Sequence, residues 1–295
     1  MELWAPIWPA KVDFDSCSEL PPLADEIVIW RDESGPFTIS RINDSPDPRF
    51  RLRLKNASAI DVLADRRFIV HAGANAPNNT HEHFLADQAV PRAMSHEGSF
   101  VLHAGAVRFG QDAILIMGQS GRGKSTLASS FDHAGFALMG DDAMIISSLD
   151  ATPRVRPVYP SLRLLPDSID ALMPGAATTE PMAHYSSKQR IDVMVAHETS
   201  DWPLPIVAIY SIAEPVEGDR IALRRMTLAE TCMSLVTNSF ALDPSDTTRA
   251  RDRMEQASDL ARHVPAFEIS YPRDYARLPE VRQAILDQVA ALAPA

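Results

Sequence analysis

Cysteine is scarce in this chain, and its spacing matches no reactive or metal-binding pattern. The two cysteines, Cys17 and Cys232, lie far apart in a sequence of 295 residues. A disulfide framework, a zinc site of paired cysteines and a Cys-x-x-Cys redox pair are therefore excluded. We expect both thiols to be reduced and the protein to be cytoplasmic.

Basic charge and long apolar runs are also lacking. The chain has 28 Lys and Arg against 39 Asp and Glu, a net charge of −11. A non-specific nucleic-acid binder needs a basic face, so we expect no nucleic-acid partner. No apolar run approaches the roughly 20 residues of a membrane-spanning helix. Residues 1–6 show no basic segment leading into an apolar core, so we expect neither a membrane partner nor a secretory signal.

The composition is that of an ordinary globular protein, with 45% hydrophobic and 23% charged residues. Short β-prone runs dominate the first part of the chain and predict a small β-rich domain over residues 1–78, followed by a larger domain over 79–295. The β-prone runs lie at 26–31, 36–40, 49–54 and 67–71, and turns are predicted at 33–36 and 43–48. Arg49, Arg51 and Arg53 share one strand face, which is either solvated or a docking edge for an acidic partner.

Residues 80–97 have the apolar spacing of a helix, which Pro91 should kink or split. Four histidines lie in or before it, without a cysteine or carboxylate set at ligand spacing. They are His71, His81, His83 and His96. Positions at the surface or at the core edge are favoured over a metal site.

The stretch from Gly118 to Ser125 reads Gly-Gln-Ser-Gly-Arg-Gly-Lys-Ser and matches the phosphate-loop pattern. An apolar strand is predicted at 113–117 and a helix from Thr126, which is the context such a loop requires. Glycines let backbone N–H groups converge on phosphate oxygens, Lys124 can reach the outer phosphates, and Ser125 can ligate Mg²⁺. The sequence therefore predicts an ATP site formed by Gly118, Gln119, Ser120, Gly121, Arg122, Gly123, Lys124, Ser125 and Thr126.

Two adjacent carboxylates, Asp141 and Asp142, interrupt the apolar strand predicted at 136–146. Burying neighbouring anions is costly unless a cation or a proton compensates. Beside a phosphate loop, Mg²⁺ can compensate one carboxylate and the proton of a substrate hydroxyl the other. His103 lies two predicted strands before the phosphate loop.

These elements together resemble the catalytic domain of HPr kinase/phosphorylase, over roughly residues 80–165. The resemblance rests on the loop 118–125, on the segment from Gly135 to the aspartate pair, and on His103-Ala-Gly105 upstream. It implies a mixed α/β fold of the type shared with phosphoenolpyruvate carboxykinase. From their own residues, the later strands are predicted at 205–212, 220–225 and 267–271, and the later helices at 227–240, 245–262 and 279–292. Thr227 and Glu230 predict a capping box at the start of the first of these helices, and Gly135 is the predicted C-cap of the helix after the phosphate loop.

The resemblance also implies roles for individual residues. Lys124 would hold the β- and γ-phosphates, and Ser125 and Asp142 would support Mg²⁺. Asp141 would accept the proton of the attacking hydroxyl, with His103 tuning it. Arg163 is either a phosphate clamp or a surface arginine. Lys188 and Arg190 are candidates for the family's late active-site arginine.

The chain departs from the family after the aspartates. Residues 157–167 lack the glycines and the metal-binding glutamate of the family's signature loop. Reverse phosphorolysis and HPr as substrate are therefore left open. The chain, like other shortened HPr-kinase-like proteins, also resembles the tailoring kinases that phosphorylate ribosomal precursor peptides, including lasso-peptide precursors. We expect an ATP-dependent kinase acting on a Ser of a protein or peptide, with a homo-oligomer possible. The alternatives are a nucleotide-binding regulatory module and a small-molecule kinase.

Overall fold

A computed structural model describes residues 8–17, 26–31, 37–42, 49–54, 58–73, 78–159, 162–174, 178–183, 186–191, 202–214 and 220–292. The turns predicted at 33–36 and 43–48 lie outside these residues, as do the side chains of Cys17, Arg49 and Arg190. The chain divides into two units. The first contains Met1–Ser99, Pro181–Ser187 and Phe240–Asp252, and the second contains Phe100–Glu180, Lys188–Ser239 and Arg253–Ala295.

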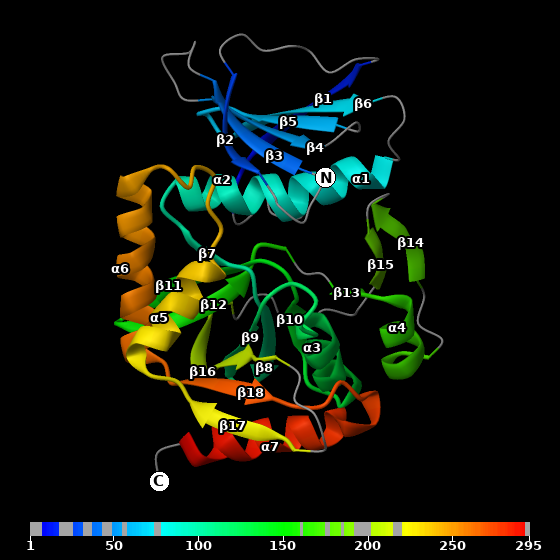
Figure 1. The fold of residues 1–295 in the computed structure, drawn as a ribbon, viewed down its shortest axis with the longest axis vertical. Helices are drawn as coiled ribbons and strands as arrows, with labels where there is room; N and C mark the ends of the chain where they lie inside the picture. Colours follow the sequence, from blue (N-terminus) through cyan, green and yellow to red (C-terminus); the bar gives the residue numbers. More distant parts are fainter. Residues whose placement is uncertain are drawn as a thin grey trace. The chain divides into compact units, whose positions relative to one another are not determined.

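The first unit is built on a six-stranded sheet in the order β1-β6-β5-β4-β3-β2 (Figure 1). Its strands are β1 Lys11–Cys17, β2 Glu26–Arg31, β3 Phe37–Ile42, β4 Arg49–Leu54, β5 Ser58–Val62 and β6 Arg67–Gly73. The four strands predicted from the sequence are confirmed. Strands β1 and β5 were not predicted, and β1 is mostly exposed, so no buried face marks it.

A helical segment follows, split as its proline predicts. It consists of α1 Asn78–Phe84, a π-helical turn over Leu85–Ala89, and α2 Val90–His96 with Pro91 in its first turn. A proline has no backbone N–H to donate, so the regular hydrogen-bond pattern changes just before it. His83 and His96 are half-buried, which agrees with the predicted core-edge position, whereas His71 and His81 are fully buried.

Arg51 does not lie on a solvated face or a docking edge, and that prediction is wrong for this residue. Its side chain is 1% exposed and forms two bonds to Asp61, of 2.6 Å from Nε and 2.7 Å from Nη2. Asp61 is the residue paired with Arg51 on the neighbouring strand, and it also lies 2.9 Å from His71 Nε2. A carboxylate placed opposite on the next strand compensates the buried guanidinium.

The second unit is built on a nine-stranded mixed sheet. Its main path is β10-β8-β9-β16-β12-β11-β7, and β18 joins β16 and also pairs with β17. The strands are β7 Phe100–Leu102, β8 Gly105–Phe109, β9 Asp112–Met117, β10 Leu138–Gly140, β11 Met144–Leu149, β12 Thr152–Pro157, β16 Leu204–Ile212, β17 Ala222–Arg225 and β18 Ala266–Ser270. A small three-stranded sheet has the order β13-β15-β14, with β13 Leu162–Leu164, β14 Thr178–Ala183 and β15 Ser186–Ile191.

The helices of this part of the chain begin and end at signals in the sequence. They are α3 Lys124–His133, α4 Pro166–Leu172, α5 Leu228–Thr237, α6 Thr247–His263 and α7 Leu278–Leu292. Thr227 and Glu230 form the capping box predicted for α5. Gly135 has a φ of 88°, which suits the predicted end of α3. Helix α4 and strand β12 were not predicted.

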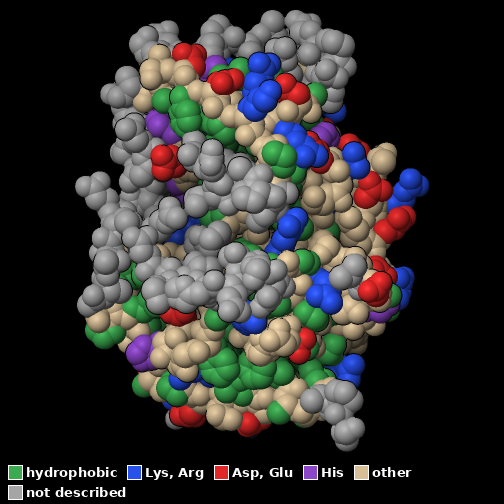
Figure 2. All heavy atoms as spheres, turned by 180° about the vertical axis from the view of Figure 1, so that it is seen from behind, with side chains coloured by type: hydrophobic (Ala, Val, Ile, Leu, Met, Phe, Trp, Pro, Cys, Tyr) green, Lys and Arg blue, Asp and Glu red, His purple; other side chains and the backbone are tan. Residues whose placement is uncertain are grey.

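Charged side chains are mixed on the face drawn in Figure 2, where Lys and Arg lie among Asp and Glu. No helix in the described ranges is both long and apolar enough to cross a bilayer.

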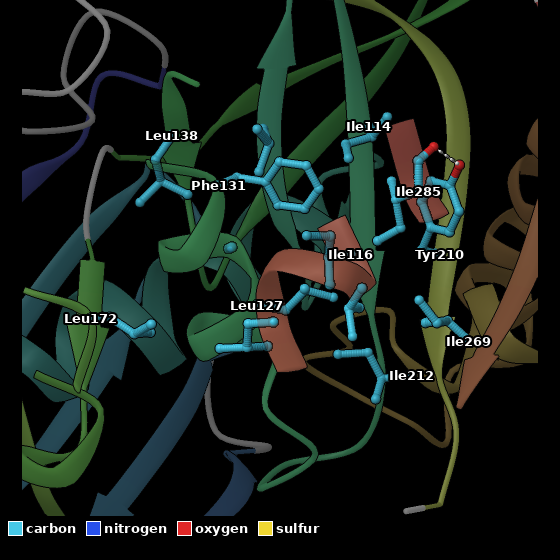
Figure 3. Close-up of a cluster of buried hydrophobic side chains, with 14 of the residues drawn as sticks. Ile114, Ile116, Leu127, Phe131, Leu138, Leu172, Tyr210, Ile212, Ile269 and Ile285 are labelled. Atoms are coloured by element: carbon cyan, nitrogen blue, oxygen red, sulfur yellow. Dashed lines mark hydrogen bonds between the residues drawn. The ribbon is translucent and has the colours of Figure 1, made fainter. Parts of the chain in front are cut away.

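The central strand β9 is buried on both faces. Ile114 and Ile116 belong to one apolar cluster, which includes residues of α3 and α7 (Figure 3). Ala113, Leu115 and Met117 belong to a second cluster, which includes Leu235 of α5 and Leu260 of α6. A continuous apolar run is the pattern expected of a strand covered on both sides. This burial fixes the position at which the chain leaves β9 and enters the phosphate loop.

Candidate active site

The predicted phosphate loop joins β9 to α3 and contains three glycines in the left-handed region. Gly118, Gly121 and Gly123 have φ values of 148°, 77° and 93°. A Cβ atom on Gly118 would lie 3.1 Å from the carbonyl oxygen of Ile212. The loop therefore has the strand–glycine loop–helix geometry that the sequence predicts, and glycine is required to adopt it. Phosphate binding itself stays a prediction.

Lys124 folds back over this loop. Its Nζ donates to the carbonyl oxygen of Gly118 at 2.8 Å and to that of Gln119 at 3.4 Å. The side chain is 6% exposed, and burial lowers the pKa of Lys124 to about 8, although Asp142 and Asp141 act in the opposite direction. The ammonium is thus held at the loop and is less costly to deprotonate than a surface lysine.

The aspartate pair lies between β10 and β11, and its two members have different surroundings. Asp141 is 1% exposed, accepts the backbone N–H of Arg163 at 3.0 Å and is hydrogen-bonded by the side chain of Ser125. Burial, with the charge of Asp142 as the second cause, raises the pKa of Asp141 well above its usual range. Asp142 instead forms an ion pair with Arg163, with 2.9 Å between Oδ2 and Nη1.

Arg163 is buried, with 3% exposure, so the surface alternative is wrong. The guanidinium bonds the hydroxyl of Tyr159 and lies 5.4 Å from the centre of its ring. Strand β13 positions Arg163 opposite Arg190 of β15. The carboxylate of Asp142 and the aromatic ring together hold the guanidinium in place.

His103 lies in the short break between β7 and β8. Its backbone N–H donates to the carbonyl oxygen of Asn238 at 2.7 Å, and its side chain is half-buried. Two residues further on, a Cβ atom on Gly105 would lie 3.7 Å from the Cα atom of Asp141. The chain after His103 therefore runs directly beside the aspartate pair.

These residues meet at a cleft of about 350 Å³ within the second unit. Of the predicted site residues, His103, Asp142, Arg163, Lys188 and the loop from Ser120 to Thr126 line the cleft. Gly118, Gln119 and Asp141 do not line it. The cleft is completed by Leu164, Leu165, Asp167, Ser168, Tyr271, Arg273, Asp274, Tyr275 and Leu278.

Most of the remaining residues that line the cleft could not be predicted from the sequence, because no local motif marks them. Sheet topology brings them to the loop. Strands β9, β16 and β18 are mutually parallel neighbours, so their carboxyl ends lie at one edge. At that edge Arg122 pairs with Glu214, and Arg273 donates to the carbonyl oxygen of Gly121 at 3.0 Å. The carboxyl edge of parallel strands is where ligands bind in open α/β sheets.

The donor set at the cleft suits Mg²⁺. The hydroxyl of Ser125 and the carboxylate of Asp142 are hard oxygen ligands on the same cleft wall. Among the described residues, no group of three or more His, Cys, Asp and Glu side chains could hold a metal. Mg²⁺ is usually held by one or two carboxylates together with substrate phosphates, so a sparse protein donor set fits it.

Comparison with known proteins gives a distant likeness. No family model matches the sequence, and no curated protein matches it. Among solved structures, the chain is similar to that of the Hpr(Ser) kinase/phosphatase from Coxiella burnetii. The identity is 10% and the TM-score 0.32, with 65% of this chain and 99% of that chain covered. The mixed α/β class rests on the sheets described above, and no residue role is taken from this match.

Proposed function

We propose that this chain is an ATP-dependent kinase that transfers the γ-phosphate to a Ser hydroxyl of a protein or peptide. The observation that carries the proposal is the meeting of Lys124, Ser125 and Asp142 at one cleft, with the buried Asp141 hydrogen-bonded to Ser125. Phosphoryl transfer needs a phosphate cradle, a proton acceptor and charge stabilisation, with little covalent chemistry. The cleft offers residues suited to each task.

In this proposal the loop N–H groups and Lys124 hold the phosphates, and Arg163 stabilises negative charge on the transferred group. Ser125 and Asp142 would hold Mg²⁺, which when bound supplies further charge stabilisation. Asp141 accepts the proton of the attacking hydroxyl. Burial raises the pKa of Asp141, and a carboxylate with a raised pKa is a stronger proton acceptor.

One observation favours a second assignment of the two carboxylates. Asp142 lines the cleft, whereas Asp141 is buried, does not line it and accepts a hydrogen bond from Ser125. A substrate hydroxyl in the cleft would then meet Asp142 first, and Asp141 would support the metal through Ser125. Single Asn substitutions of Asp141 and Asp142 distinguish these assignments.

The proposal is tested with the purified full chain, γ-labelled ATP and an array of synthetic Ser peptides. A matched array carries Ala in place of each Ser, and a mixture of hydroxylated metabolites serves as the competing class of acceptor. We expect label on Ser peptides only, and none with Lys124→Ala. Label on metabolites would indicate a small-molecule kinase, and nucleotide binding without turnover would indicate a regulatory module.

A further inference from the structure

One end of the cleft has no part in the phosphate and proton steps. It is formed by the start of α4 and by the segment after β18, and we refer to it as the outer end. Its residues are Leu165, Asp167, Ser168, Tyr271, Tyr275 and Leu278.

A chain of side-chain contacts links the outer end to the first turn of α3. The Thr126 hydroxyl lies 3.3 Å from that of Ser168, which lies 2.9 Å from the Tyr275 hydroxyl. Tyr275 in turn donates to Asp167 Oδ2 at 2.9 Å. On the other side, a Cβ atom on Gly123 would lie 3.7 Å from the Tyr271 hydroxyl. The outer end therefore begins directly beside the proposed phosphate loop.

The direction of a bound nucleotide follows from the loop. In a phosphate loop the lysine reaches the outer phosphates, and the backbone cradles the inner ones. Lys124 therefore marks the side of the γ-phosphate, and Asp142, which acts on the charge of Lys124 and forms an ion pair with Arg163, lies on that side. The α-phosphate and the nucleoside attached to it must therefore lie on the side of Thr126, toward the outer end.

The chemistry of the outer end suits a nucleoside. Leu165 is apolar yet 42% exposed, and Tyr275 is half-buried with its hydroxyl held by polar partners. The apolar face of a flat base can pack against such side chains, and contact between a base and an aromatic ring is a common source of affinity. The exposed carboxylate of Asp167 can accept a hydrogen bond from the sugar or from the edge of the base.

We propose that the outer end is the nucleoside subsite, in which Leu165 and Tyr275 cover the base and Asp167 accepts a nucleoside hydrogen bond. This inference rests on the proposed function, because it requires the loop to hold the phosphates. Two separable regions then contribute to the affinity for ATP. The phosphate loop binds the triphosphate, and the outer end binds the nucleoside.

Calorimetric titration of the full chain with two probes, MgATP and Mg²⁺–tripolyphosphate, separates these regions. Leu165→Ser and Tyr275→Ala should each weaken MgATP about tenfold and change tripolyphosphate less than about twofold. Leu228→Ser is the matched control, because Leu228 is also an exposed leucine (51%) but does not line the cleft. It should change neither affinity. Lys124→Ala should weaken both probes.

The failures are distinguishable. If the parent protein binds MgATP no more tightly than tripolyphosphate, or if Leu165→Ser leaves MgATP binding unchanged, the nucleoside subsite is wrong while the phosphate loop stands. If the parent protein binds neither probe, the proposed function fails, and the subsite fails with it. Leu165 is exposed, so its substitution should not disturb folding.

Discussion

At the scale of single residues, the adjacent carboxylates Asp141 and Asp142 should respond differently to substitution. Asp141→Asn removes the proposed proton acceptor but not the phosphate cradle. We expect kcat to fall by about 100-fold or more, with an ATP dissociation constant within about threefold of the parent. Asp142→Asn should instead raise the Mg²⁺ concentration needed for half-maximal rate. Steady-state kinetics over a Mg²⁺ series, with calorimetry for ATP, measures both effects.

The reverse result has an equally definite meaning. If Asp142→Asn loses kcat at saturating Mg²⁺ and Asp141→Asn mainly shifts the metal requirement, the proton acceptor is the carboxylate that lines the cleft. Activity of Asp141→Asn equal to that of the parent would refute the role assigned to Asp141.

If the loop binds ATP as proposed, Lys124 should make the affinity for ATP depend on pH. Burial lowers its pKa to about 8 in the free protein, and only the protonated ammonium attracts phosphate. Affinity should therefore be full below pH 8 and fall by up to about tenfold per pH unit above it. Lys124→Arg is the matched control, because a guanidinium stays charged over this range. Its affinity should be lower but flat between pH 7 and pH 9 by the same calorimetric titration.

The lowered pKa of Lys124 makes folding stability depend on pH in the opposite direction to ATP affinity. Between pH 8 and the ordinary lysine value the unfolded chain binds the proton that folded Lys124 has lost. Stability contributed by this group therefore rises with pH in that window. A parallel fall of ATP affinity and stability above pH 8 would mean that another group controls binding.

At the scale of elements, the phosphate loop can be tested with a pair of glycines that are matched in conformation. Gly121 in the loop and Gly110 in the β8–β9 turn have φ values of 77° and 64°, and a Cβ atom on either would meet nothing within 4 Å. Alanine at each position should lower the free energy of unfolding by about 1 kcal/mol, because the backbone at both positions has the left-handed conformation. Only Gly121→Ala should also weaken ATP binding, since its Cβ would enter the proposed cradle.

Chemical denaturation and calorimetry of both variants provide the comparison. A loss of ATP affinity in Gly110→Ala as large as that in Gly121→Ala would show that binding follows stability rather than loop geometry.

Some features of the fold and the cleft could be predicted from the sequence, and others could not. The loop, the aspartate pair and the capping box of α5 were predictable because each is a short pattern with a local physical cause. Burial of Arg51 was not, because its partner Asp61 comes from a neighbouring strand that was not predicted. Tyr271 and Tyr275 reach the cleft only because β18 lies parallel to β16, and β16 to β9. Register between distant strands has no local signature.

At the scale of the whole molecule, the net charge of −11 should influence which peptides are phosphorylated. The cations that line the cleft, among them Lys124, Arg163 and Lys188, are assigned to phosphate or lie near the aspartates. An approaching peptide therefore meets a predominantly negative protein. We expect a higher kcat/KM for a basic Ser peptide than for an acidic one of equal length, at saturating ATP.

Screening provides the control for this prediction. Long-range attraction decays over about 10 Å at 0.1 M salt, so the preference should shrink when the salt is raised from about 50 mM to about 500 mM. A preference that persists at high salt would reflect direct contacts with the basic side chains rather than the field of the protein. An acidic peptide favoured at low salt would show that cations at the cleft, and not the net charge, control the approach of the acceptor.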